Sequence, residues 1–132
     1  MAKQVKLSTL KARLWRLVSE YVRRKDANSD GLVECVTCGK WSHWKDTHAG
    51  HFLPKKKGSA VYFDLRNIHP QCPHCNVWQH GNIHAYYDYM MEWYGQEIID
   101  ELKQLARKPL KITRVQYDDM IEVMKVKLEN MS

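Results

Sequence analysis

Apolar residues recur at steps of three and four positions over the first part of the chain. The series is Leu7, Leu10, Leu14, Leu17 or Val18, and Tyr21 or Val22. This spacing puts the apolar side chains on one face of a helix. The Ser8 hydroxyl can cap its first turn, and the series stops near Arg24. We therefore expect an amphipathic helix that begins near Ser8 and ends near Arg24.

Residues 82–132 show helical spacing three more times. We expect one helix over residues 83–94 and a second over residues 98–105. A third opens at Thr113, because Thr113 and Gln116 have the spacing of a capping box. The aromatic and methionine residues of these helices are expected to face the core rather than a cofactor. The pattern predicts a helical tail.

The middle of the chain has short apolar segments separated by turn-forming residues. Residues 32–36 are typical of a short strand. Residues 51–53 and 61–63 are expected to form a hairpin joined by the loop 54–59. A short helix is expected over residues 72–81. Strands in the middle and helices on both sides indicate an α+β fold.

Length favours one domain made of three parts, since 132 residues is an ordinary domain size. The parts are residues 1–31 (basic helix and loop), 32–81 (core) and 82–132 (helical tail). No apolar run reaches the roughly 18 residues of a membrane span, so no membrane association is expected. The first residues have no apolar signal core, which favours the cytoplasm. In that reducing compartment, paired cysteines are metal ligands more often than disulfides.

Positive charge is concentrated at the start of the chain. The formal net charge is +6. Residues 1–25 contain eight basic residues and one acidic residue, so they carry +7 and the rest carries −1. Such a surface indicates nucleic acid as a partner, although a solvated helix face would explain the charge as well. The candidate DNA-binding residues are Arg13, Arg16, Arg23, Lys55, Lys56 and Lys57.

All four cysteines of the chain form two Cys-x-x-Cys pairs, Cys35–Cys38 and Cys72–Cys75. Each short loop can present two sulfur atoms to one ion, which is the arrangement of a tetrahedral zinc site. Four thiolates leave no open position for a substrate. We therefore expect one structural zinc that staples the core, and any catalysis needs other residues.

The residues around these pairs resemble a known enzyme group. Gly50-His51 lies between the pairs, Asn67 lies five residues before the second, and Asn76 follows it directly. This order resembles the HNH (ββα-metal) endonucleases. Two longer patterns are similar to the lambdoid phage NinG (Rap) recombination protein family. They are Trp44-Lys45-x-x-x-x-Gly50-His51 and Cys72-x-x-Cys75-Asn76-x-x-x-x-Gly81-Asn82-x-x-x-Tyr86.

The resemblance implies an HNH-like core and a DNA endonuclease that acts on branched DNA, such as Holliday junctions. It assigns His51 as general base, a role that suits an imidazole near neutral pH. Asn76 would offer its amide oxygen to a catalytic divalent metal. Asn67 would bind the loop or orient His51 rather than touch the metal, and a simple turn role explains it equally well.

One position departs from the HNH pattern. Most HNH enzymes have an Asp ligand directly before the His, and this chain has Gly50 there. His48 or Asp46 would have to supply the missing ligand. A histidine ligand favours softer divalent ions such as manganese, nickel or zinc over magnesium. A zinc module that binds DNA without cutting it, or an HNH nuclease of linear duplex, remains the alternative.

Paired cuts in a junction call for two active sites, so a homodimer is expected. The helical tail is large for a unit whose chemistry ends at Asn76, and we expect it to carry the dimer interface.

Overall fold

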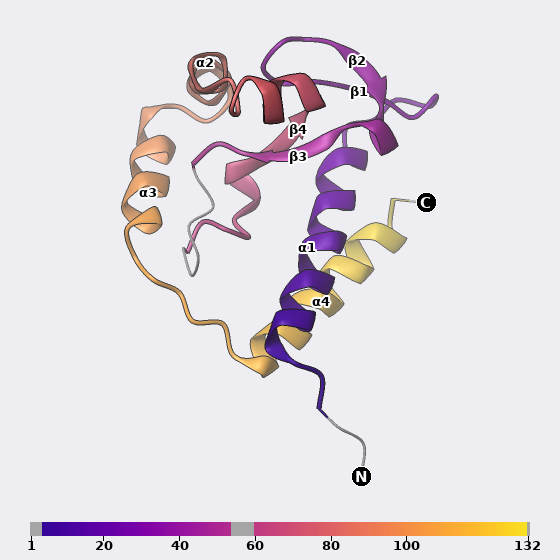
Figure 1. Cartoon of the computed structure of the whole chain (residues 1–132), viewed down its shortest axis with the longest axis vertical. Helices are drawn as coiled ribbons and strands as arrows, with labels where there is room; N and C mark the ends of the chain where they lie inside the picture. The colour runs from indigo at the N-terminus through magenta and orange to yellow at the C-terminus, as the bar shows by residue number, and fades with distance from the viewer. Residues whose placement is uncertain (1–3, 54–59, 132) are drawn as a thin grey trace.

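A computed structural model describes residues 4–53 and 60–131. The described residues form an α+β fold with four α-helices and two small antiparallel sheets. Figure 1 shows the β3–β4 pair between helix α1 on one side and helices α2 and α3 on the other. None of the described helices has the length and apolar character needed to cross a membrane.

Helix α1 (Leu7–Arg24) has the periodicity read from the sequence. Its buried residues are Leu10, Leu14, Val18 and Val22. The helix begins before the expected cap, because Ser8 lies inside it and Lys6 is the N-cap residue, without a side-chain hydrogen bond. The expectation of a Ser8 cap is therefore wrong. Arg23 and Arg24 in the last turn complement the negative end of the helix dipole.

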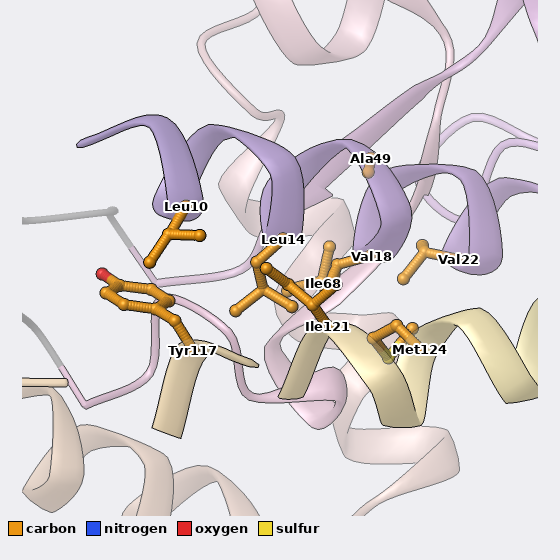
Figure 2. Close-up of a cluster of buried hydrophobic side chains, with 9 residues drawn as sticks. All are labelled: Leu10, Leu14, Val18, Val22, Ala49, Ile68, Tyr117, Ile121 and Met124. Atoms are coloured by element: carbon orange, nitrogen blue, oxygen red, sulfur yellow. The ribbon is translucent and has the colours of Figure 1, made fainter. Parts of the chain in front are cut away.

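Helix α4 (Arg114–Glu129) packs along α1. Thr113 and Gln116 form the predicted capping box, with the Thr113 Oγ1 accepting from the Gln116 amide at 3.2 Å. In Figure 2, Ile121 and Met124 of α4 point toward Leu14 and Val18 of α1. The first and last helices of the chain therefore share one hydrophobic core.

The strands pair differently from the prediction. β3 (His48–His51) pairs antiparallel with β4 (Ile68–Gln71), in the register His48↔Gln71 and His51↔Ile68. The expected hairpin of residues 51–53 with residues 61–63 is wrong, since residues 60–63 form a turn. Val61 is fully buried in a second core instead of pairing in a ladder. Burial of a short apolar run does not specify its hydrogen-bonding partner.

A second core forms beneath α2 (Ile83–Trp93) and α3 (Gln96–Ala106). It consists of Phe52, Val61, Tyr86, Met90, Ile99 and Leu102. Both helices lie close to their predicted ranges. A smaller sheet pairs β1 (Leu32–Glu34) with β2 (Trp41–His43) in antiparallel orientation, next to the cysteines.

Three short helical turns complete the described chain. They are η1 (Trp44–Asp46), η2 (Leu65–Asn67) and η3 (His74–Trp78). The last is a π-helical turn, shorter than the helix predicted over residues 72–81. The chain leaves it through His80, Gly81 and Asn82, whose φ angles are 49°, 90° and 47°. Left-handed backbone cannot continue a right-handed helix, which explains the early end.

Candidate metal centre and adjacent polar cavity

The four cysteines meet at one point between the two sheets. Their sulfur atoms all lie within 4.8 Å of one another. A zinc–sulfur bond of about 2.3 Å requires tetrahedral sulfur–sulfur separations of about 3.8 Å. The Cys38 and Cys72 sulfurs, 3.6 Å apart, already meet that requirement. The four thiols can therefore hold a structural zinc ion, and the donor set fits the metal predicted from the sequence.

The surroundings shift the pKa values of the cysteine thiols in different directions. Burial raises the pKa of Cys38 to about 12 and also raises the pKa of Cys72, whereas the pKa of Cys35 is lowered. The Thr37 hydroxyl lies 3.3 Å from the Cys35 sulfur. Burial raises the pKa of Cys35, but hydrogen bonds from Thr37 and from backbone amides outweigh it and lower the pKa to about 6. The Cys75 amide donates to the Cys72 sulfur at 3.4 Å, and the Asn82 side chain donates to the Cys75 sulfur at 3.6 Å.

A polar cavity lies next to the zinc ligands. In its wall, the Asn76 Nδ2 donates a hydrogen bond to the His48 Nδ1 at 3.1 Å. The cavity has a volume of about 350 Å³. It is lined by Trp15, Ser19, Arg23, Thr47, His48, Ala49 and Asn76. The structure therefore brings together two predicted metal ligands, His48 and Asn76, and one predicted DNA-binding residue, Arg23.

Arg23 is held in place at the cavity wall. Its Nε donates to the Ser19 carbonyl at 3.0 Å, and its Nη1 donates to the Trp44 carbonyl at 3.2 Å. Burial lowers the pKa of Arg23, and Glu20 partly offsets this. The guanidinium groups of Arg23 and Arg24 lie 5.4 Å and 5.2 Å from the Trp44 ring centre. A fixed, half-buried cation at a polar cavity is suited to binding phosphate.

Arg13 and Arg16 lie in a different place. They line a hollow between α1 and α4, together with Asp118 and Glu122 of α4. The expected basic face of α1 is therefore divided into two parts. Arg13 and Arg16 lie beside acidic residues of α4, and Arg23 lies at the polar cavity. The Lys55–Lys57 run falls outside the described residues.

His51 lies at the end of β3, on the side of the strand opposite to His48 because side chains alternate along a strand. Its Nε2 is 2.9 Å from the Tyr62 carbonyl. A carbonyl only accepts hydrogen bonds, so Nε2 carries the proton and Nδ1 is the basic nitrogen of the neutral ring. The imidazole stacks on Trp15, with ring centres 5.0 Å apart and planes inclined by 19°. Trp15 thus contacts His51 and also lines the cavity.

Asn67 is fully buried and bonds to the backbone around the loop. Its Oδ1 accepts from the Leu53 amide at 2.9 Å. Its Nδ2 lies 3.3 Å from the carbonyl oxygens of Leu53 and of Val61. All three bonds go to the two ends of the segment between Leu53 and Val61, which matches the loop-binding role weighed for it. Asp46, the other candidate ligand, is exposed in η1 and is not part of the cavity lining.

Gln71 explains why position 50 has no side chain. A Cβ atom on Gly50 would lie 1.9 Å from the Gln71 Oε1, far inside contact distance. The Gln71 Nε2 donates to the Gly81 carbonyl at 2.9 Å and to the Thr37 hydroxyl at 3.2 Å. The Gln71 amide therefore occupies the space of a residue-50 side chain.

A buried hydrogen-bond network surrounds His69, and it was not predicted from the sequence. Tyr86 donates to the Gly50 carbonyl at 2.7 Å and lies 2.9 Å from His69 Nδ1. Since the Tyr86 proton is used there, His69 Nδ1 donates to Tyr86, and Nε2 accepts from Tyr94 at 2.9 Å. Asn67, His69 and Gln71 alternate with buried neighbours and are themselves buried. The alternation of the polar residues Asn67, His69 and Gln71 just before a cysteine pair is the sequence signal from which this network could have been predicted.

Comparisons with known proteins identify the family. The family model described as "Bacteriophage Lambda NinG protein" matches residues 2–132. The chain belongs to the NinG family. The "Protein ninG" of Escherichia phage 933W is 32% identical over 88 residues, which cover 65% of this chain and 40% of that protein. The proteins of the same name from Escherichia phage lambda and Salmonella phage P22 are 31% identical over the same coverage.

The aligned part of this NinG-family chain thus spans about two fifths of the length of these relatives. No solved structure matches it.

Proposed function

We propose that this NinG-family chain is a metal-dependent endonuclease that cuts branched DNA, such as Holliday junctions. The observation that carries the proposal is the cavity in which His48, Asn76 and Arg23 meet. The chain order from β3 through β4 to η3 supports the HNH-like core that the sequence resembles, since it gives two antiparallel strands followed by a helical turn. The four thiols would keep the zinc structural.

His51 is the proposed general base. The Tyr62 carbonyl holds the proton on Nε2, and Nδ1 is the nitrogen that would accept a proton from the attacking water. Stacking on Trp15 fixes the plane of the ring. A base held in one tautomer and one orientation has less to reorganise as the reaction proceeds.

Arg23 is proposed to bind the scissile phosphate. Cleavage adds negative charge to the phosphate, and a cation already in position stabilises that charge. Ser19 and the Trp44 carbonyl hold the guanidinium at the cavity before DNA arrives. This role is more specific than the general backbone contact expected from charge alone.

His48 and Asn76 are proposed to hold the catalytic divalent metal, which would be magnesium, manganese or nickel. The Asn76 amide now directs its nitrogen at His48 Nδ1, and a half-turn of the amide would present its oxygen to the same space. When bound, such a cation would polarise the phosphate and steady the leaving oxygen. An imidazole donor favours manganese or nickel over magnesium.

One observation favours a second candidate, a zinc module that binds branched DNA without cutting it. The usual ligand position before the histidine is Gly50, and Gln71 fills the space beside it. Among the described residues, the four cysteines are the group of three or more His, Cys, Asp or Glu side chains placed to hold a metal ion. His48 is not part of such a group. A non-cutting module would use the same cationic cavity to grip DNA.

Cleavage of a labelled four-way junction and of matched linear duplex, each with magnesium, manganese and nickel, tests the proposal. We expect metal-dependent cutting of the junction. His51→Ala should lower the rate by about a hundred- to ten-thousand-fold while junction binding persists. His84→Ala, on an exposed helix position, is the matched control and should cut normally. Junction binding without cutting in any metal would favour the second candidate, and preferred cutting of duplex would reject the branched substrate.

A further inference from the structure

A second cleft lies between the β1–β2 sheet and helix α2, and the proposed function makes no use of it. Its volume is about 520 Å³. Four aromatic rings line it: Trp41, Tyr89, Trp93 and Tyr94. Trp41 and Trp93 are 53% and 68% exposed, so their ring faces are available to a ligand. Large aromatic side chains left this exposed around a hollow are typical of a binding site.

The floor of this aromatic cleft is rigid. Tyr94 donates its hydroxyl proton to the buried His69, and the Tyr89 ring packs edge-on against the same imidazole with ring centres 5.1 Å apart. Trp93 continues the row, with its ring centre 6.2 Å from that of Tyr89. The rings of Tyr89, Trp93 and Tyr94 therefore have partners within the chain before a ligand binds, which reduces the ordering cost of binding.

Charge decides which ligand fits. The cleft contains the carboxylates of Asp26 and Glu34 and the ammonium of Lys25. Lys25 is paired with Asp26 at 3.8 Å, whereas Glu34 forms no ion pair among the described residues. The lining is thus net negative in a chain whose formal charge is +6. These carboxylates would repel a phosphate backbone and attract a cation.

We propose that the aromatic cleft binds an arginine side chain presented by a partner protein. Guanidinium groups stack on tryptophan and tyrosine faces and form paired hydrogen bonds with a carboxylate, which here is Glu34. The surface is separate from the cavity of His48 and Asn76, whose lining shares no residue with it. This NinG-family chain therefore has a protein-docking site in addition to its proposed DNA site.

Titration of the zinc-loaded 132-residue chain with acetyl-Gly-Arg-Gly-amide tests the proposal. The five tryptophan indole N–H signals in NMR spectra are the readout. We expect the signals of Trp41 and Trp93 to shift and those of Trp15 and Trp78 to stay. The same peptide with citrulline, which is uncharged and nearly the same shape, should bind about five- to tenfold more weakly. Glu34→Gln should weaken the arginine peptide by a similar factor.

Trp93→Ala should abolish the Trp41 shift, and Trp78→Ala, on a similarly exposed residue outside the cleft, should leave it unchanged. Equal binding of the arginine and citrulline peptides would overturn the proposal, as would an absence of shifts at Trp41 and Trp93. A short single-stranded oligothymidylate is the alternative ligand. If it shifts the Trp41 and Trp93 signals, and shifts them more strongly in Glu34→Gln than in the wild type, the cleft is a nucleobase site instead. Junction cleavage by Trp93→Ala should be normal, so the two proposals fail independently.

Discussion

At the scale of single residues, Gly50 and Gln71 form one unit. The Gln71 side chain fills the space that a side chain at position 50 would need. Its amide also hydrogen-bonds to Thr37 and to the Gly81 carbonyl. The Gly50 backbone is therefore closely packed against Gln71. Placing the aspartate of the HNH pattern at position 50 requires a change at both positions.

Gly50→Asp alone should lower the free energy of unfolding by about 1–3 kcal/mol or more, because the new side chain overpacks a buried strand pair. Gln71→Ala in the same chain should recover part of that loss by vacating the space. Urea unfolding of the two single variants and the double variant gives the coupling energy. Additive effects would show that the two residues do not compete for space.

His69 makes stability depend on pH. Burial, with a smaller effect from Lys25, lowers the pKa of His69 to about 3 from an ordinary value of 6.5. Between pH 6.5 and pH 3, the His69 imidazole is therefore protonated in the unfolded chain and neutral in the folded chain. The stability contributed by neutral His69 is complete above pH 6.5 and is lost as the pH falls toward 3.

Over that interval the wild-type free energy of unfolding should fall by up to about 1.4 kcal/mol per pH unit from this residue. His69→Phe should be less stable at neutral pH, because Tyr86 and Tyr94 lose a partner, yet its slope with pH should be shallower. Urea unfolding from pH 7 to pH 4, with zinc release followed in both proteins, separates this effect from loss of the metal. Identical slopes would mean that the pKa of His69 is the same in the folded and the unfolded state.

At the scale of elements, the pairing of α1 with α4 changes the role of the tail. Tyr117, Ile121 and Met124 bury the apolar face of α4 against the N-terminal helix. This face is used within the chain, so a dimer interface on α4 would have to use outward residues such as Val115, Val123 and Val126. The expected tail interface is thus confined to a smaller surface.

Ile121→Ala should destabilise the protein by about 2–5 kcal/mol, because it removes buried methyl groups from the core between α1 and α4. Val123→Ala on the exposed side of the same helix is the control and should change stability by about 0.5 kcal/mol or less. Thermal unfolding followed by circular dichroism measures both. A similar loss in the two variants would mean that residue 123 also packs against another surface.

Elements with long periodic patterns were predictable from the sequence, and so was the short strand at residues 32–34, but the pairing of the short strands in the middle of the chain was not. The four α-helices and the capping box at Thr113 agree with their spacing. The pairing of β3 with β4 did not follow from the apolar runs, since Val61 is as apolar as a strand residue but packs under α2 and α3. The cysteine cluster followed from spacing, whereas the meeting of Arg23 with His48 and Asn76 depends on how α1 crosses the sheet.

At the scale of the whole molecule, the candidate zinc ligands add a further link between two parts that hydrogen bonds already join. The Val36 amide donates to the Pro70 carbonyl at 3.0 Å, and the Gln71 amide donates to the Thr37 hydroxyl. Cys35 and Cys38 lie in the turn that connects β1 to β2, and Cys72 and Cys75 follow β4. The α1–α4 core and the α2–α3 core are both formed by other residues. Metal removal should therefore affect the cysteine region and the adjacent cavity before it affects the helices.

Chelation of the metal should remove up to about 10 kcal/mol of apparent folding free energy from the cysteine region. Elemental analysis should find one zinc per chain before chelation, and the thermal unfolding transition should fall or broaden afterwards. Cys38→Ser, at the exposed ligand, should reproduce the effect. Unchanged stability after complete metal removal would contradict a structural role for zinc.

DNA binding should distinguish the two groups of arginines on α1. Arg23→Gln should reduce junction affinity and make the dependence of log affinity on log salt shallower by about one unit, as expected for one phosphate contact. Arg13→Gln should change both less, because Asp118 and Glu122 of α4 line the same hollow. Fluorescence anisotropy with a labelled junction at several salt concentrations provides the comparison. Equal effects of the two substitutions would indicate that Arg13 and Arg23 belong to one continuous basic face, as expected from the sequence.

Asn67 fastens both ends of the segment between Leu53 and Val61 to one buried side chain. The distance between those ends is then set by Asn67 and not by what connects them. The cost of closing a loop rises slowly with its length, so this connection is a place where sequence can be inserted, shortened or recharged without moving His51. A NinG-family protein built this way can vary that connection as an independent part while the strand that carries its candidate base stays in register.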